Sequence, residues 1–262
     1  MAIYMWRMPD YLCFTANTAG STVRLRKSWS PTSVTLETST DRQNWSTYAI
    51  WDTITLSNIW DKVYWRNTSD TTTNFSTRTS AFYYFTMTGS IAASGEATSL
   101  INKNLTDTIN GSYSFYKLFT GCASLTTPPK LSATTLTASC YSNMFLNCTW
   151  LVKATNLPAT TLATQCYDQM FYWCSSLEEL TSLPALEHWA KTAYTYMFDG
   201  CSKIKLSTTQ TWEYQTPYRI PTTWEWTQSS TWNMSGMFNN TWWTFKWKPT
   251  INTTYYTSNT VV

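Results

Sequence analysis

Short alternations of apolar and polar residues occupy the first third of the chain. Segments with a period of two lie at residues 11–14, 22–26, 34–37, 53–56 and 62–66. Turn-forming pairs such as Ser30-Pro31 and Ser57-Asn58 separate them. Successive side chains of a strand point to opposite faces, so the alternation predicts strands that each bury one face. Short strands at this spacing predict a small Ig-like β-sandwich over residues 1–95.

A second pattern occupies residues 115–206, where one five-residue phrase occurs four times. Leu-Phe-Thr-Gly-Cys returns as Met-Phe-Leu-Asn-Cys, Met-Phe-Tyr-Trp-Cys and Met-Phe-Asp-Gly-Cys. The cysteines that end the phrases are spaced by 26, 26 and 27 residues, at Cys122, Cys148, Cys174 and Cys201. A leucine or isoleucine follows each cysteine by three residues. A fixed period of this length predicts a solenoid, in which each coil buries its apolar edge against the next.

Within a coil, apolar pairs four residues apart precede the Met-Phe dipeptide. Cys166 pairs in this way with Met170, and Tyr167 with Phe171, which predicts a short helix. The chain after the cysteine, which runs to Pro184 in the third copy, is expected to be extended. The predicted fold class is therefore mixed α/β. An N-terminal β-sandwich is followed by a linker at 96–112, a leucine-rich-repeat-type solenoid at 113–206 and a C-terminal cap at 207–262.

Residues 157–177 carry a resemblance to a known family. Leu-Pro-Ala-Thr-Thr-Leu, then Cys-Tyr-Asp-Gln-Met-Phe-Tyr-Trp-Cys and Ser-Ser-Leu, resembles the BspA-like leucine-rich repeats of bacterial surface and bacteriophage proteins. Residues 41–46 are similar to a tight hairpin in domains that precede such repeats. The resemblance implies a right-handed solenoid used for adhesion, and it supplies no catalytic residue. Ser132 departs from the pattern at the position of Pro158, and the last copy is one residue longer.

The last segment, residues 207–262, is rich in Thr, Trp and Asn and has no period of its own. One echo of the repeat remains, where Met237-Phe238 returns 40 residues after the Met-Phe pair of the fourth copy. We interpret this echo as a degenerate final coil, and we expect an edge strand near residues 253–257.

Charge is sparse and nearly balanced. Charged residues make up 13% of the chain, and the formal net charge is +3. Arg24, Arg26 and Lys27 form the densest basic cluster, but alternation on a strand places Arg24 and Arg26 together on a solvent face. We therefore expect no nucleic-acid partner. No apolar run is long enough to cross a bilayer, so no membrane insertion is expected.

The seven cysteines and the single histidine, His188, offer little chemistry. Equivalent cysteines of adjacent coils would stack about 5 Å apart, which does not exclude disulfides. We favour reduced, buried core residues. No Cys-x-x-Cys pair is present for zinc, and neighbouring Glu178 and Glu179 would point to opposite faces of an extended segment. No catalytic residue, metal or cofactor is therefore expected.

Tryptophan is unusually abundant, with 16 in 262 residues. Trp173 precedes Cys174 in a column otherwise held by Gly121, Asn147 and Gly200, residues that tolerate a positive φ. Trp29, Trp60 and the pair at 242–243 also stand in turn-like segments that favour glycine. One hypothesis is that some of these codons are UGA, read as tryptophan where the ancestral residue was glycine. The rival hypothesis is selection of tryptophan to build an aromatic binding surface.

These patterns favour a non-enzymatic structural or binding protein. Indoles beside hydroxyls and amides suit sugar rings, and the candidate ligand-contact residues are Trp173, Trp189, Trp212, Trp224 and Trp226. Residues 1–10 lack a basic start and an apolar run, so no secretory signal is expected there. We therefore expect a phage virion accessory protein, such as a tail, fibre or capsid-decorating protein. Its partners would be other virion proteins or a host-surface protein or glycan.

Two other readings stay open. A bacterial cell-surface adhesin of the BspA-like type would carry the same repeats, and it would need an export signal or an anchor. A glycan-active enzyme is the more distant class, because it would need carboxylates that converge on one substrate.

Overall fold

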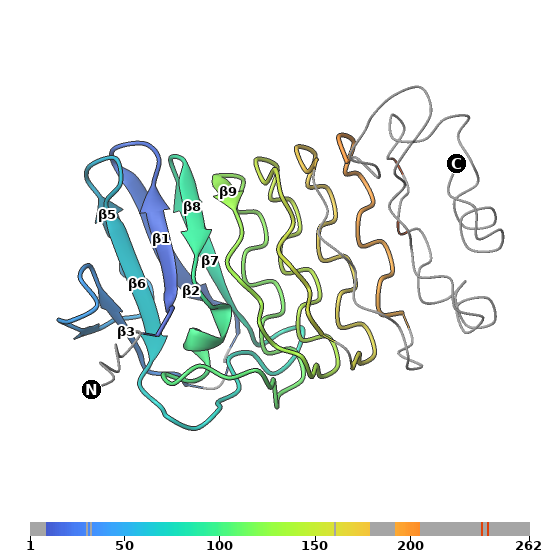
Figure 1. The fold of residues 1–262 in the computed structure, drawn as a ribbon, viewed down its shortest axis with the longest axis horizontal. Coiled ribbons are helices and arrows are strands. Elements are labelled where there is room, and N and C mark those ends of the chain that lie inside the picture. The colour runs from blue at the N-terminus through green and yellow to red at the C-terminus, as the bar shows by residue number, and fades with distance from the viewer. Residues whose placement is uncertain are drawn as a thin grey trace, which may run out of the picture.

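The computed structural model describes residues 9–29, 31, 33–159, 161–178, 192–204, 237 and 240. The described strands are β1 (Leu12–Ala16), β2 (Ser21–Lys27), β3 (Leu36–Ser39), β4 (Ser46–Thr47), β5 (Ile54–Leu56), β6 (Lys62–Asn67), β7 (Tyr83–Thr88), β8 (Ile91–Ser94) and β9 (Leu125–Thr127). A 3-10 helix, η1 (Ala97–Leu100), follows β8. The strands form a six-stranded sheet of order β4-β3-β6-β1-β8-β9 and a three-stranded sheet of order β5-β2-β7, neither of which closes (Figure 1).

The strands predicted from alternation in residues 11–66 are confirmed, with boundary shifts of a few residues. Alternate residues of β2 and β7 are buried, and Val23, Leu25 and Phe85 point into the core. Across the core, the ring of Phe85 lies 4.9 Å from that of Phe14 in β1 and 5.2 Å from that of Trp65 in β6. Ring packing between the two sheets therefore joins them. Residues 41–46 form the predicted hairpin between β3 and β4.

The mixed α/β fold class is wrong. No α-helix occurs among the described residues, the two sheets make the structure nearly all β, and no leucine-rich-repeat-type solenoid is indicated. Turns replace the predicted helix in each copy, with left-handed residues at every fourth position, such as Tyr113, Lys117 and Gly121. A left-handed residue interrupts the helical hydrogen-bond ladder. The apolar i, i+4 spacing reflects this four-residue turn period and was misread as helical.

Backbone amides of the turn segments alternate between two directions. In the first copy, the amides of Leu118 and Cys122 bond to the carbonyl three residues back. The amides of Phe115 and Phe119 bond instead to carbonyls of the next copy, at 2.8 Å each. The second copy repeats the pattern toward the third, and the third toward the fourth. Each copy is thereby hydrogen-bonded to its neighbour, and we call the described parts of residues 113–204 the repeat stack (Figure 1).

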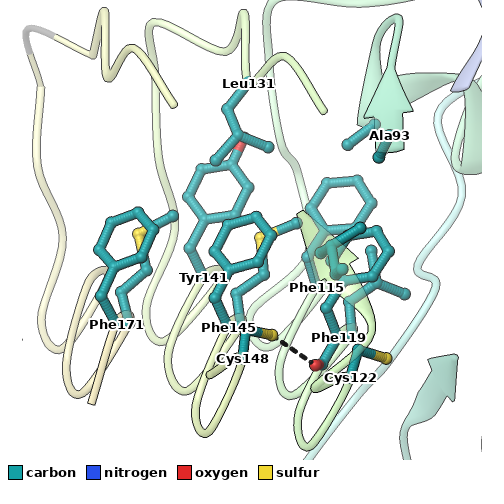
Figure 2. Close-up of a cluster of buried hydrophobic side chains, with 14 of the residues drawn as sticks. Ala93, Phe115, Phe119, Cys122, Leu131, Tyr141, Phe145, Cys148 and Phe171 are labelled. Atoms are coloured by element: carbon teal, nitrogen blue, oxygen red, sulfur yellow. Dashed lines mark hydrogen bonds between the residues drawn. The ribbon is translucent and has the colours of Figure 1, made fainter. Parts of the chain in front are cut away.

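Two rows of aromatic rings fill the repeat stack. The Phe row has centroid separations of 5.3 to 5.7 Å and runs through Phe85, Phe119, Phe145, Phe171 and Phe198. The Tyr row has separations of 5.6 to 5.9 Å and runs through Phe115, Tyr141, Tyr167 and Tyr194. Figure 2 shows parts of both rows beside buried cysteines. The ring spacing follows from the hydrogen bonds, which hold successive chains at about 5 Å.

The β-sheets continue into the repeat stack. Phe85 of β7 begins the Phe row, and its amide donates to the carbonyl of Leu118 at 2.7 Å. β9, from the first copy, adds a parallel strand beside β8 in the six-stranded sheet. The intervening segment at 96–112 buries Leu100, Ile101 and Ile109. All of these side chains belong to one continuous hydrophobic core.

Met237 occupies a fifth position in the hydrogen-bond pattern of the stack. The amide of Phe198 donates to its carbonyl at 2.9 Å, as the amide of Phe171 does to Met197. Asn240, three residues later, has a φ of 55° and donates from Nδ2 to Oδ1 of Asp199 at 2.8 Å. These two residues repeat the geometry of the earlier copies across the longer interval. The strand predicted near residues 253–257 lies outside the described residues.

Candidate binding surface

Trp173 is the one candidate contact residue that falls in the described part of the chain. Its φ is 58°, in a column where Gly121, Asn147 and Gly200 have φ values of 72°, 61° and 77°. The left-handed conformation predicted for this column is confirmed. The indole is 49% exposed and lies against Gly200, where a Cβ atom would meet its ring atoms at 3.0 to 3.2 Å. Glycine at position 200 therefore makes room for the ring.

Trp150 flanks the cysteine turn of the neighbouring copy. Its side chain is 52% exposed, and Val152 beside it is 39% exposed. Trp150 was not predicted as a contact residue, although a large aromatic two residues after Cys148, where other copies have serine or lysine, was a usable signal. We call the exposed indoles of Trp150 and Trp173, with the hydroxyls of Thr149 and Ser175, the cysteine-edge surface. Partly exposed rings beside hydroxyls suit a sugar or a protein contact.

The other candidate residues, Trp189, Trp212, Trp224 and Trp226, lie outside the described residues. The same holds for His188, Glu179 and Trp243.

Three described tryptophans have a left-handed backbone. Trp60 has a φ of 72°, which confirms that its turn favours glycine, and Trp51 has a φ of 87°. Trp51 was missed, although it stands between Ile50 and Asp52 in a turn-like segment. Trp29 does not have a positive φ, so its predicted turn geometry is not observed. The choice between a UGA codon and a selected tryptophan remains a hypothesis that intact mass would test.

Four thiols of the repeat stack donate hydrogen bonds to backbone carbonyls. Each of these Sγ atoms donates to a phenylalanine carbonyl at 3.0 to 3.1 Å, which belongs to β7 for Cys122 and to the preceding copy for Cys148, Cys174 and Cys201. Figure 2 shows the bond from Cys148 to Phe119. All seven cysteines are free and buried, which confirms the core role predicted for them. Burial raises the pKa of the Cys122 thiol to about 12. A protonated thiol is a poor nucleophile and a poor metal ligand.

Asp168 is a partly buried carboxylate of the described repeats. Burial raises the pKa of Asp168 to about 6, and a hydrogen bond from Ser142, at 3.5 Å, opposes the shift. Among the described residues, no group of three histidine, cysteine or acidic side chains could hold a metal ion. In the same residues, no helix is long and apolar enough to cross a membrane.

Comparison of the chain with protein families, curated proteins and solved structures found no match. Neither the BspA-like resemblance nor any function drawn from it gains support from a relative. Function is therefore inferred from the surfaces that this structure presents.

Proposed function

We propose that this chain is a non-enzymatic attachment protein, most specifically a phage virion accessory in a tail, a fibre or the capsid decoration. The observation that supports the proposal is the contrast within the repeat stack. Its thiols donate hydrogen bonds to backbone carbonyls inside the stack, while the indoles of Trp150 and Trp173 are about half exposed at the cysteine-edge surface. Large exposed rings on an ordered scaffold are typical of contact surfaces.

The scaffold suits such a role. Hydrogen bonds between copies and stacked rings leave little freedom for the turns that carry the two indoles. A surface ordered before binding loses less conformational entropy when a partner docks. The proposed partners are another virion protein, or a protein or glycan on the host surface.

The decisive experiment is to locate the protein. Virions from a lysate would be purified on a density gradient, analysed by mass spectrometry and labelled with antibodies raised against this chain. We expect the chain to band with capsid proteins and to label particles. Recovery only in the envelope of intact bacterial cells would contradict a virion role and favour the surface-adhesin alternative.

A second experiment tests the contact surface. The variants Trp150→Ala and Trp173→Gly should each weaken adsorption of the protein to its host surface or to depleted virions, while the fold stays intact. Substitution of Trp29, which is 83% exposed and lies outside the repeat stack, is the matched control. Equal adsorption by all variants would exclude the cysteine-edge surface as the contact.

A further inference from the structure

The outer face of the three-stranded sheet carries two arginines beside aromatic rings. Arg24 and Arg26 alternate along β2 with Val23 and Leu25, which are fully buried, so both arginines point away from the core. In the antiparallel register, Arg26 lies opposite Tyr84 of β7. Cross-strand partners of this kind have adjacent side chains.

Trp51 covers both guanidinium groups. Its backbone amide donates to the carbonyl of Leu25 at 3.2 Å, which holds residue 51 beside β2. The Cζ atoms of Arg24 and Arg26 then lie 5.8 and 5.0 Å from the centroid of the indole. Cations at this distance from a ring are attracted by its electron-rich face.

Aromatic contacts continue the arrangement from β7 onto the first copy of the repeat. The ring of Phe82 lies 5.7 Å from that of Tyr84 and 5.4 Å from that of Tyr116. Lys117 places its Nζ atom 5.6 Å from the ring of Phe82 and 5.2 Å from that of Tyr116. We name this set the cationic band, and its members are Arg24, Arg26, Trp51, Phe82, Tyr84, Tyr116 and Lys117.

The cations of this band lack acidic partners. Within the described part of the chain, the side chains of Arg24 and Arg26 make no hydrogen bond and no ion pair, and their Nε atoms are buried without an acceptor. Lys117 forms no ion pair there either. Asp52 follows Trp51 and is exposed, but it lies beyond 4.0 Å of both guanidinium groups. Three cations on one face, none of them in an ion pair, are complementary to an anionic partner.

Arg66, on the other sheet, shows the contrasting arrangement. Its guanidinium lies 3.9 Å from the centroid of Trp45, and it is also paired with Glu37 at 2.8 Å. Arginines therefore lie against an indole on both sheets, but only Arg66 is also paired with a carboxylate.

We infer that the cationic band binds a carboxylated polysaccharide. A guanidinium presents paired N–H donors that match a carboxylate in bidentate geometry. Rings of Trp51, Tyr84 and Phe82 supply flat surfaces for the C–H faces of sugars, and Thr22 and Thr86 add hydroxyls on the same face. A nucleic acid fits less well, because three cations and a net charge of +3 provide little phosphate neutralisation.

This inference rests on the proposed attachment function, to which it adds a ligand class and a site distinct from the cysteine-edge surface. The test measures binding of the full chain to polygalacturonate, alginate and hyaluronan by biolayer interferometry. Highly methyl-esterified pectin serves as the comparator, because it keeps the galacturonate backbone and removes most of the charge. We expect binding to at least one carboxylated polymer, weakening as salt is raised, and much weaker binding to the ester.

The double variant Arg24→Gln/Arg26→Gln should lower that affinity by about tenfold or more, since it removes two charge-assisted contacts. Trp51→Gly should also weaken binding. The fold should tolerate this change, because glycine suits the left-handed backbone at position 51 and no core contact is removed. Arg66→Gln is the matched control and should bind like the parent chain.

The inference would be overturned if the chain bound none of the three carboxylated polymers. Unchanged affinity in the double variant, or tighter binding to a single-stranded oligonucleotide than to any of the polymers, would overturn it as well. The location experiment remains separate. A chain that is found in virions but does not bind the polymers refutes only this inference. Binding through the band by a chain absent from virions refutes only the virion assignment.

Discussion

Trp60 combines a strained backbone with an exposed side chain. Its φ of 72° is held by a turn in which its amide donates to the carbonyl of Ala16 at 2.8 Å. The indole is 72% exposed, so little packing offsets the left-handed conformation. For a bulky L-residue that conformation costs about 1–2 kcal/mol.

Trp60→Gly should therefore raise the free energy of unfolding by about 1 kcal/mol, because glycine adopts a positive φ without strain. Urea denaturation followed by circular dichroism would measure the change. Trp29→Gly is the control, since Trp29 is exposed but not left-handed, and it should give no increase. An equal gain in both variants would show that loss of an exposed indole, and not the backbone, is responsible.

The buried thiols lead to a second prediction at the same scale. Burial raises the pKa of both Cys122 and Cys166 to about 12, so almost no thiolate is present at pH 8. In the native protein, we expect Ellman's reagent to label fewer than about one of the seven cysteines within an hour. Full labelling should follow in guanidinium chloride. Rapid native labelling of two or more thiols would contradict the burial.

At the scale of elements, the repeat copies depend on one another for burial. Phe145 is fully buried between Phe119 and Phe171, with ring centroids 5.4 and 5.3 Å away. A copy removed from the stack would expose this ring on both sides. The turns of an isolated copy would contribute little to its stability, because half of their amides form hydrogen bonds only with the neighbouring copy.

Phe145→Ala should consequently destabilise the protein by about 3–5 kcal/mol, the range for loss of a buried aromatic side chain. Chemical denaturation would measure the loss. Trp150→Ala, an exposed aromatic substitution in the same copy, should change stability by less than about 0.5 kcal/mol. Similar losses in the two variants would contradict a stack held together by its ring rows.

Asp168 makes the stack sensitive to pH. Burial raises the pKa of this carboxyl from 3.8 to about 6. At a pH between 3.8 and about 6, the folded chain therefore keeps a proton that the unfolded chain has released. The stability provided by the neutral carboxyl is present below pH 3.8 and is lost as the pH rises through about 6.

Asp168→Asn should remove this loss and stabilise the protein at pH 7 by about 1–2 kcal/mol. The asparagine oxygen can still accept the hydrogen bond from Ser142. Denaturation at several pH values would compare the two chains, whose stabilities should converge below pH 4. A parent chain that gains stability relative to the variant as the pH rises would contradict the shift.

At the scale of the whole molecule, Phe85 joins the sheets to the stack. It is fully buried, and its ring contacts Phe14 and Trp65 across the sheets and Phe119 in the first copy. The carbonyl of Phe85 also accepts the thiol hydrogen of Cys122 at 3.1 Å. The three-stranded sheet thus caps the repeat stack as a preceding copy would.

Phe85→Ala should accelerate amide exchange in β1 and in the first repeat copy together, because one continuous core serves both. Hydrogen exchange with mass spectrometry would follow peptides that contain Phe14 and Phe119. Faster exchange confined to one of the two would show that sheets and stack unfold separately.

Alternation predicted the strands correctly, and comparison of equivalent repeat positions predicted a left-handed column and buried cysteines, whereas the solenoid predicted from repetition is not indicated. The strands at 22–26 and 62–66, the left-handed column at Trp173 and the buried cysteines were all visible in it. The predicted helix before the Met-Phe dipeptide failed, since an i, i+4 apolar pattern is shared by a helix and by a chain of four-residue turns. A helix and a chain of such turns differ in the carbonyls that accept from their amides, and in the turns half of these carbonyls belong to the neighbouring copy.

By itself, then, the sequence determined the burial of alternate strand residues and of the repeat cysteines, and the left-handed column at Trp173, because these follow from hydropathy and residue type within the repeat. Tertiary structure alone decided that β7 begins the Phe row and that the cationic band joins Trp51, Tyr84 and Tyr116. Those relations join residues far apart along the chain. They arise from strand pairing and from hydrogen bonds between copies, which no local pattern specifies.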